Sequence, residues 1–227
     1  MLSEIKTTGT GLLVILSLTL MVLPAALAGE TTTVPVEDVL TSIESRYTNK
    51  SFTARFSQES QLKAMEITDT AAGRIFVEYP GKMRWEYDQP EKQIMITDGR
   101  RLWIYRPAEN QVMTGQAPDI VGDGRGASFL SDLKVLRKKF RISAAPVQET
   151  ASYTLVLNPL QSSPELSSIE LKIRRSTFDI LEITTLNTYG DITRIWFNDI
   201  HFVSSLESRL FSFTIPEGAD VVRLGEE

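Results

Sequence analysis

Residues 82–87 read Lys-Met-Arg-Trp-Glu-Tyr, and the alternation within this stretch decides the fold. Met83, Trp85 and Tyr87 are apolar or aromatic, whereas each residue that precedes them carries a charge. Successive side chains of a β-strand point to opposite faces of the sheet. The period of two therefore predicts a strand with one buried face, and Pro80-Gly81 just before it marks a turn.

The same period recurs on both sides of this stretch. Phe52, Ala54 and Phe56 alternate with polar residues, and Asp98-Gly99 is a strong signal for a hairpin turn. The other segments that we predict as strands are 73–79, 93–97, 101–105, 110–114, 141–144, 152–158, 168–174, 180–189, 192–202 and 210–214.

Two further segments have the period of a helix, with apolar residues at Val36, Val39, Leu40, Ile43 and Tyr47, and again at Phe129, Leu133, Leu136 and Phe140. A single sheet of about ten strands twists enough to curl or close. The apolar stripes of the helices must be buried on that sheet. We therefore predict a mainly β fold with helices (α+β), built as a strongly curved antiparallel sheet whose hollow is plugged by helices.

The N-terminus has the pattern of a secretory signal peptide. A polar start that contains Lys6 is followed by an apolar run over residues 12–27, which ends at Ala26-Leu27-Ala28. We expect cleavage after Ala28, which makes residues 1–28 the signal and residues 29–227 a single mature domain. Because the chain has no Cys to carry a lipid, we expect a soluble periplasmic protein.

Composition argues against most enzymes and against nucleic-acid binding. The net charge of −5 disfavours a nucleic-acid partner. The lack of Cys excludes disulfides, thiol catalysis and thiolate metal sites. His201 is the single histidine, so a Ser-His-Asp hydrolase would depend on it alone. We expect no catalytic residue, no metal and no cofactor.

Aromatic and methionine side chains are concentrated between residues 76 and 113. A sheet must bury one face, and core packing explains most of them. A pliable apolar ligand cavity is the alternative, because Met and aromatic side chains adapt to irregular ligands. The pattern leaves both interpretations open for Phe76, Tyr79, Met83, Trp85, Tyr87, Met95, Trp103, Tyr105 and Met113.

A basic cluster ends the second helical segment, at Lys134, Arg137, Lys138, Lys139 and Arg141. Such a run commonly forms a solvated face beside the negative end of the helix dipole. Docking of an anionic partner or a lipid surface is the alternative.

Several segments together resemble the periplasmic outer-membrane lipoprotein carrier family, LolA, over nearly all of the mature chain. They are Phe52-x-x-x-Phe56-x-Gln58, Gly73-Arg-Ile-Phe, Tyr79-Pro80-Gly81-Lys-Met-Arg-Trp85, Pro90, Asp98-Gly99-x-x-Leu102-Trp103-x-Tyr105, Gln111-Val112 and Phe211-x-Phe213-x-x-Pro216-x-Gly218.

The resemblance implies an open, incomplete β-barrel covered by a helical lid. It also implies a monomeric carrier that takes acylated lipoproteins from an inner-membrane ABC exporter and delivers them to the outer membrane, to an acceptor where one is present. Tyr79 stands where many members have an Arg that latches the lid. With the aromatic and methionine cluster, the resemblance implies a cavity of Phe76, Met83, Trp85, Tyr87, Met95 and Trp103, and a lid of Tyr79, Phe129, Leu130 and Leu133.

Two other functions stay open from the sequence. A related protein of the same fold could shuttle a glycolipid or sense mislocalised lipoproteins. A hydrolase that uses His201 is the third possibility. The lack of an N-terminal Cys counts against the membrane-anchored acceptor of the same fold.

Overall fold

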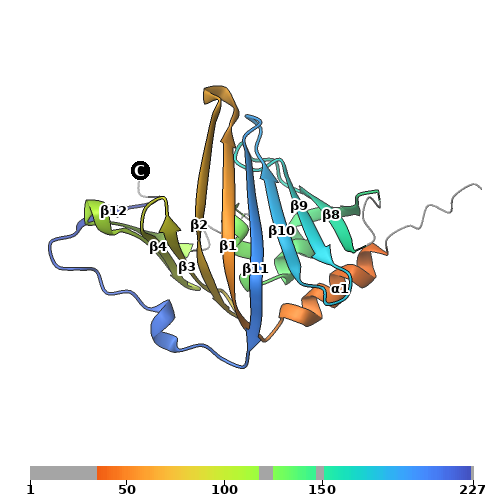
Figure 1. Cartoon of the computed structure of the whole chain (residues 1–227), viewed down its shortest axis with the longest axis horizontal. Helices are drawn as coiled ribbons and strands as arrows, with labels where there is room; N and C mark the ends of the chain where they lie inside the picture. The colour runs from red at the N-terminus through yellow and green to blue at the C-terminus, as the bar shows by residue number, and fades with distance from the viewer. Residues whose placement is uncertain (1–34, 118–124, 147–150, 226–227) are drawn as a thin grey trace, which may run out of the picture. The chain divides into compact units, whose positions relative to one another are not determined.

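The computed structural model describes residues 35–117, 125–146 and 151–225, which all belong to the second of two units, Thr32–Glu227 (Figure 1). The signal peptide predicted for residues 1–28, and the start of the domain predicted for 29–227, lie outside the described residues. The described helices are α1 (Val36–Tyr47) and α3 (Lys134–Lys139), with the 3₁₀ helices η1 (Lys63–Met65), η2 (Pro107–Glu109), η3 (Arg125–Ser131) and η4 (Ser208–Phe211).

The strands form a 12-stranded sheet in the order β12-β6-β5-β4-β3-β2-β1-β11-β10-β9-β8-β7. The longest of them, β1, β2 and β11, have 12 residues each and lie side by side in the middle (Figure 1). The strands are β1 (Ser51–Leu62), β2 (Ile67–Glu78), β3 (Lys82–Gln89), β4 (Gln93–Asp98), β5 (Arg101–Arg106), β6 (Gln111–Gln116), β7 (Phe140–Ala144), β8 (Ser152–Pro159), β9 (Ser168–Arg174), β10 (Ile180–Leu186), β11 (Ile192–Val203) and β12 (Asp220–Arg223).

The predicted fold class is confirmed as mainly β with helices, but the predicted shape of the sheet is wrong. β12 runs parallel to β6, so the sheet is mixed and not purely antiparallel. β12 and β7 end the sheet as two separate edges, and the sheet is neither closed nor strongly curled into an incomplete barrel. Other segments cover its apolar faces, and these faces are therefore buried without closure.

One face of the sheet, here called the inner face, holds the main hydrophobic core. Residues directly opposite each other in antiparallel strands share a face. The pairs Phe56↔Gly73, Ile75↔Trp85 and Trp85↔Met95 therefore place Phe56, Ile75, Trp85 and Met95 together. The same face continues through buried residues of β11, β10, β9 and β8 at Phe197, Ile195, Ile183, Leu171 and Leu155.

Two helical regions cover the inner face. α1 forms as predicted and buries Val39, Leu40, Ile43 and Tyr47. The second predicted helix is divided, because residues 125–131 form η3, residues 134–139 form α3, and Phe140 already begins β7. Asp132 lies at the break, where its carboxylate accepts a hydrogen bond from the Lys134 N–H at 3.2 Å. Asp competes for backbone donors in this way and favours helix starts over helix interiors.

The opposite face, here called the outer face, is covered over β3–β5 by the C-terminal segment. The predicted strand 210–214 is wrong: this part of the chain contains η4 and contacts the sheet through side chains, and the last strand is β12. Phe211 is buried, and the Phe213 ring lies 5.5 Å from Tyr105 and 6.5 Å from Trp103 between centroids. The Arg84 guanidinium donates a hydrogen bond to the Leu210 carbonyl at 3.3 Å.

Candidate functional site

A cavity of about 240 Å³ lies on the inner face, between the sheet and η3. Its apolar lining comes from β3, β4, β11 and η3, and its polar lining from β1, β3, β10 and β11. The lining residues are Gln58, Trp85, Tyr87, Met95, Ala127, Thr185, Thr193 and Ile195. The cavity therefore joins strands that are far apart in the sequence.

A glycine in β2 sets the aromatic packing beside this cavity. Gly73 pairs with Phe56 on one side and with Tyr87 on the other. A Cβ at Gly73 would lie 1.9 Å from the Glu86 carbonyl oxygen, so no other residue fits there. Without a side chain between them, the Phe56 and Tyr87 rings meet edge to face at 5.0 Å between centroids.

Phe56 also supports the tryptophan of the cavity. The Phe56 ring lies 4.9 Å from the Trp85 ring, and the Phe197 ring of β11 lies 6.2 Å from it. Trp85 is 4% exposed, so one side of the indole packs in the core while another faces the cavity. The cavity thus has a rigid aromatic wall on the β1–β3 side and a flexible thioether, Met95, next to it.

The polar end of the cavity is marked by Tyr87. Its hydroxyl donates a hydrogen bond to the Gln58 side-chain oxygen at 3.4 Å. Burial raises the pKa of Tyr87 to about 12, so the hydroxyl stays neutral at physiological pH. A second, polar cavity of about 780 Å³ also contains Gln58 and Tyr87 in its lining. These two residues therefore form the boundary between the apolar cavity and a larger polar groove.

The η3–α3 region covers the cavity, and it is fixed to the sheet by a backbone hydrogen bond. The Gly81 N–H, in the turn between β2 and β3, donates to the Ser131 carbonyl at 3.1 Å. Phe129, Leu130 and Leu133 of this region are all buried in the inner-face core.

Arg137 of α3 joins the same region to α1. Its guanidinium donates to a Glu44 carboxylate oxygen at 2.7 Å, to the Thr41 hydroxyl at 3.2 Å and to the Glu37 carboxylate. These hydrogen bonds raise the pKa of Arg137 above its usual value. The two helical regions over the inner face are thus connected by one side chain.

The structure brings together part of the predicted site. Trp85, Tyr87 and Met95 line the cavity, and Met83 is buried on the same face in register with Val77. Of the predicted lid, Phe129, Leu130 and Leu133 lie over the inner face, whereas Tyr79 is half-buried at the end of β2, next to the turn that bonds Ser131.

Phe76 and Trp103 lie on the outer face. Phe76 pairs with Arg84, and Trp103 pairs with Ile96 and faces Phe213. The lining residues that sequence reasoning missed are Gln58, Ala127, Thr185, Thr193 and Ile195. Gln58 alone left a signal, because it continues the alternation that begins at Phe52 and Phe56.

The described residues form no cluster that could hold a metal ion. Among residues 35–117, 125–146 and 151–225, no three His, Cys, Asp or Glu side chains come together as metal ligands. His201 is exposed and pairs with Thr53 on the outer face, away from the cavity. In the same part of the chain, none of the helices is of the length and hydrophobicity that a membrane span requires.

Comparison with known proteins points to one family. Residues 47–214 match the family described as outer membrane lipoprotein carrier protein LolA. The chain is 32% identical over 188 residues to the outer-membrane lipoprotein carrier protein of Coxiella burnetii, covering 82% of this chain and 87% of the relative. It is 30% identical over 217 residues to the protein of that name from Nitrosomonas europaea, covering 94% and 99%.

A solved structure shares the fold. The crystal structure of an uncharacterized conserved protein from Thermus thermophilus aligns with a TM-score of 0.53 at 15% identity, over 83% of this chain and 98% of that one. The matched family describes a transport protein and not an enzyme. The chain belongs to the LolA family of outer-membrane lipoprotein carriers, and the resemblance found in the sequence is confirmed.

Proposed function

We propose that this protein is a periplasmic carrier that holds the acyl chains of lipoproteins on the inner face and delivers them to the outer membrane. The observation that carries the proposal is the cavity beneath η3, whose apolar part has Trp85 and Met95 on the sheet side and Ala127 on the lid side. Its partners are acylated lipoproteins, an inner-membrane ABC exporter that releases them, and an outer-membrane acceptor where one is present. Residues 1–28 direct export and are then removed, and residues 29–227 act as one domain.

The cavity in this conformation is too small for its cargo, which implies that the lid moves. Its volume of about 240 Å³ is below the roughly 300–1,000 Å³ of sites for drug-sized ligands. Several acyl chains need more room, so η3 and α3 must move away from the sheet. Phe129, Leu130 and Leu133 then leave the core, and the acyl chains replace their contacts.

The free energies involved favour exchange over complete capture. Three acyl chains of about 15 methylenes each represent about 36 kcal/mol of burial at about 0.8 kcal/mol per methylene. Non-covalent affinities saturate near about 20 kcal/mol. A carrier that later releases its cargo therefore shields the chains only in part. The polar groove that begins at Gln58 and Tyr87 leaves a route by which the cargo extends outside.

Site-specific cross-linking tests the proposal. A benzophenone amino acid at position 95 should form a covalent adduct with an acylated lipoprotein released from inner-membrane vesicles, because Met95 lines the cavity. The same amino acid at position 103 is the matched control, since Trp103 lies on the outer face. Equal adducts at both positions, or none at position 95, would refute an acyl site in this cavity.

A further inference from the structure

The basic cluster found in the sequence divides into two parts with different surroundings. Arg137 is held by Glu37 and Glu44 of α1 and serves the contact between helices. The other members, Lys134, Lys138, Lys139 and Arg141, are exposed side chains of α3 and the start of β7. They form a local positive region on a chain whose net charge is −5.

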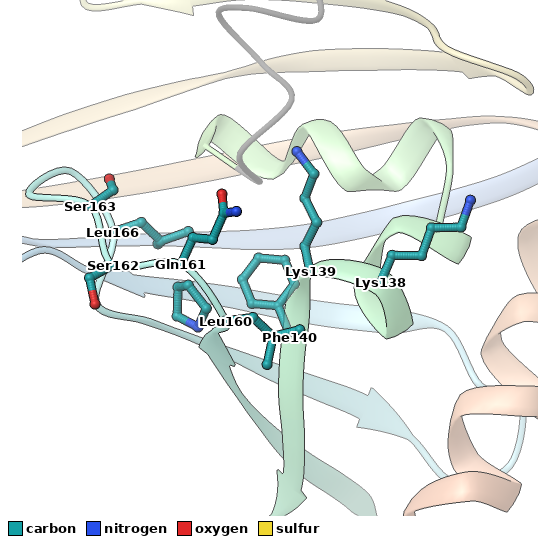
Figure 2. Close-up of a pocket in the computed structure, with 9 residues that line it drawn as sticks. Lys138, Lys139, Phe140, Leu160, Gln161, Ser162, Ser163 and Leu166 are labelled. Atoms are coloured by element: carbon teal, nitrogen blue, oxygen red, sulfur yellow. The ribbon is translucent and has the colours of Figure 1, made fainter.

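Two of these lysines border a pocket that is separate from the acyl cavity (Figure 2). Its volume is about 330 Å³, which falls within the range of small-molecule sites. Lys138 and Lys139 come from the end of α3, and the segment after β8 supplies the opposite wall. The other lining residues are Phe140, Pro159, Leu160, Gln161, Ser162, Ser163 and Leu166.

The pocket combines a buried apolar floor with an exposed apolar rim. Phe140 and Leu166 are each 4% exposed and form the floor, whereas Leu160 at the rim is 57% exposed. The Leu160 N–H donates to the Lys139 carbonyl at 2.8 Å, which fixes the leucine next to the lysines. In Figure 2, Phe140 and Leu160 lie below the Lys139 side chain, and Gln161, Ser162 and Ser163 lie to its left.

Lysines above an apolar floor suit a ligand in which an anionic group such as phosphate is attached to an apolar group. Ammonium groups and hydroxyls bind phosphate oxygens, and the floor accepts the apolar portion that adjoins the phosphate. Glu165 lies in the same segment but outside the lining, and its carboxylate accepts a hydrogen bond from the Ser163 hydroxyl at 2.6 Å. That hydroxyl is therefore already used as a donor, and the lysine ammonium groups supply the main contacts to an anion.

We propose that this pocket and the exposed cations around it dock the protein on an anionic phospholipid bilayer, with one lipid headgroup in the pocket and Leu160 among the lipids. Lys134 and Arg141 extend the positive charge beyond the pocket, to where neighbouring headgroups of a bilayer would lie. Basic side chains next to an exposed aliphatic residue are the usual composition of a membrane-surface site. Docking would keep a carrier at the membrane while its cargo is exchanged.

Vesicle flotation with the exported full chain tests the proposal. The wild type should float with vesicles of phosphatidylcholine and phosphatidylglycerol, and should not float with phosphatidylcholine alone. Lys138→Ala/Lys139→Ala should lower the partition coefficient about thirtyfold, since each cation near an anionic surface contributes about fivefold. Leu160→Ser should lower the partition coefficient about tenfold through the loss of apolar contact.

The matched control is Lys50→Ala/Arg174→Ala, which removes two exposed positive charges elsewhere. It should change the partition coefficient less than about threefold.

All of these side chains are exposed, so thermal melting should show that every variant folds. Failure of the wild type to float with anionic vesicles overturns the proposal, as does equal flotation with both lipid mixtures. A control variant weakened as much as the pocket variant also overturns it, because net charge alone would then explain binding.

A fluorescent fatty acid should bind wild type and pocket variant equally. Its failure to bind the wild type would count against the acyl cavity and not against bilayer docking.

Discussion

The two faces of the sheet over β3 and β4 are both covered, yet in different ways. On the outer face the C-terminal segment packs Phe213 against Tyr105 and Trp103 and buries Phe211. On the inner face the helical cover leaves a cavity of about 240 Å³ beside Trp85. The contrast separates a cover that completes the core from a cover that leaves space beside the sheet, which the acyl chains fill under the proposed function.

The polar contacts of the two covers fit this distinction. The inner cover is tied by the Gly81–Ser131 backbone hydrogen bond and by Arg137, whose side chain is 34% exposed. Water reaches the guanidinium of Arg137 and its carboxylate partners, which makes these ion pairs weak and reversible. The outer cover is tied by Arg84, whose side chain is 16% exposed, through the Leu210 carbonyl.

The largest effect is expected from Trp85→Glu. The substitution places a charge on the wall that the acyl chains touch, so binding of acylated lipoprotein should fall more than about tenfold. The free energy of unfolding should fall by about 3–5 kcal/mol, yet a cooperative melt should remain, because water can enter the cavity through the groove at Tyr87. Thermal melting and a lipoprotein release assay on the same variant measure both.

Trp103→Glu is the paired variant on the outer face. It should reduce stability without a specific loss of binding. If Trp85→Glu stayed folded and still extracted lipoprotein normally, the ligand site would have to lie elsewhere.

Phe213→Ala should destabilise the protein by about 2 kcal/mol, since a fully buried Phe costs about 3–5 kcal/mol and Phe213 is only half-buried. Affinity for a fluorescent fatty acid should not change, because the outer cover has no part in the exchange. Urea unfolding and a probe titration measure the two quantities. A change in affinity larger than about threefold would show that the faces are coupled.

Arg137→Gln should have a smaller effect on stability, about 1 kcal/mol, because its ion pairs with Glu37 and Glu44 are partly solvated. The weaker contact should let the inner cover open more often, so a fluorescent fatty acid should enter faster in stopped-flow measurements. Arg209→Gln provides the control, since Arg209 pairs with Glu207 within the outer cover. An equal acceleration in both variants would remove the assigned role of Arg137.

The smallest effect is expected from His201→Ala, within about 0.5 kcal/mol of wild-type stability and with unchanged lipoprotein transfer. His201 is exposed on the outer face, where no part of the cavity lies. A loss of transfer without a loss of stability would restore the hydrolase hypothesis.

Three of the eight residues that line the cavity, Trp85, Tyr87 and Met95, could be predicted from the sequence, and the errors of that prediction have a physical cause. Trp85 and Trp103 both lie in alternating strands, and the alternation predicted that each has a buried side. It could not show that they face opposite sides of the sheet, since that depends on the pairing register, Met95↔Ile104 and Ile96↔Trp103. A register change of one residue moves every side chain to the other face.

The strand-rich fold class, the amphipathic α1 and the family could all be predicted from the sequence, because they depend on local period and on the order of residue types. Tertiary structure alone decided that β12 pairs parallel to β6, that the sheet stays open, and that Thr193 and Ile195 complete a cavity with Trp85. Tertiary structure also decided that Arg137 of α3 pairs with a carboxylate of α1, and that Lys138 and Lys139 line a pocket. These are contacts between residues distant in the chain, and no local pattern specifies which distant partner a side chain meets.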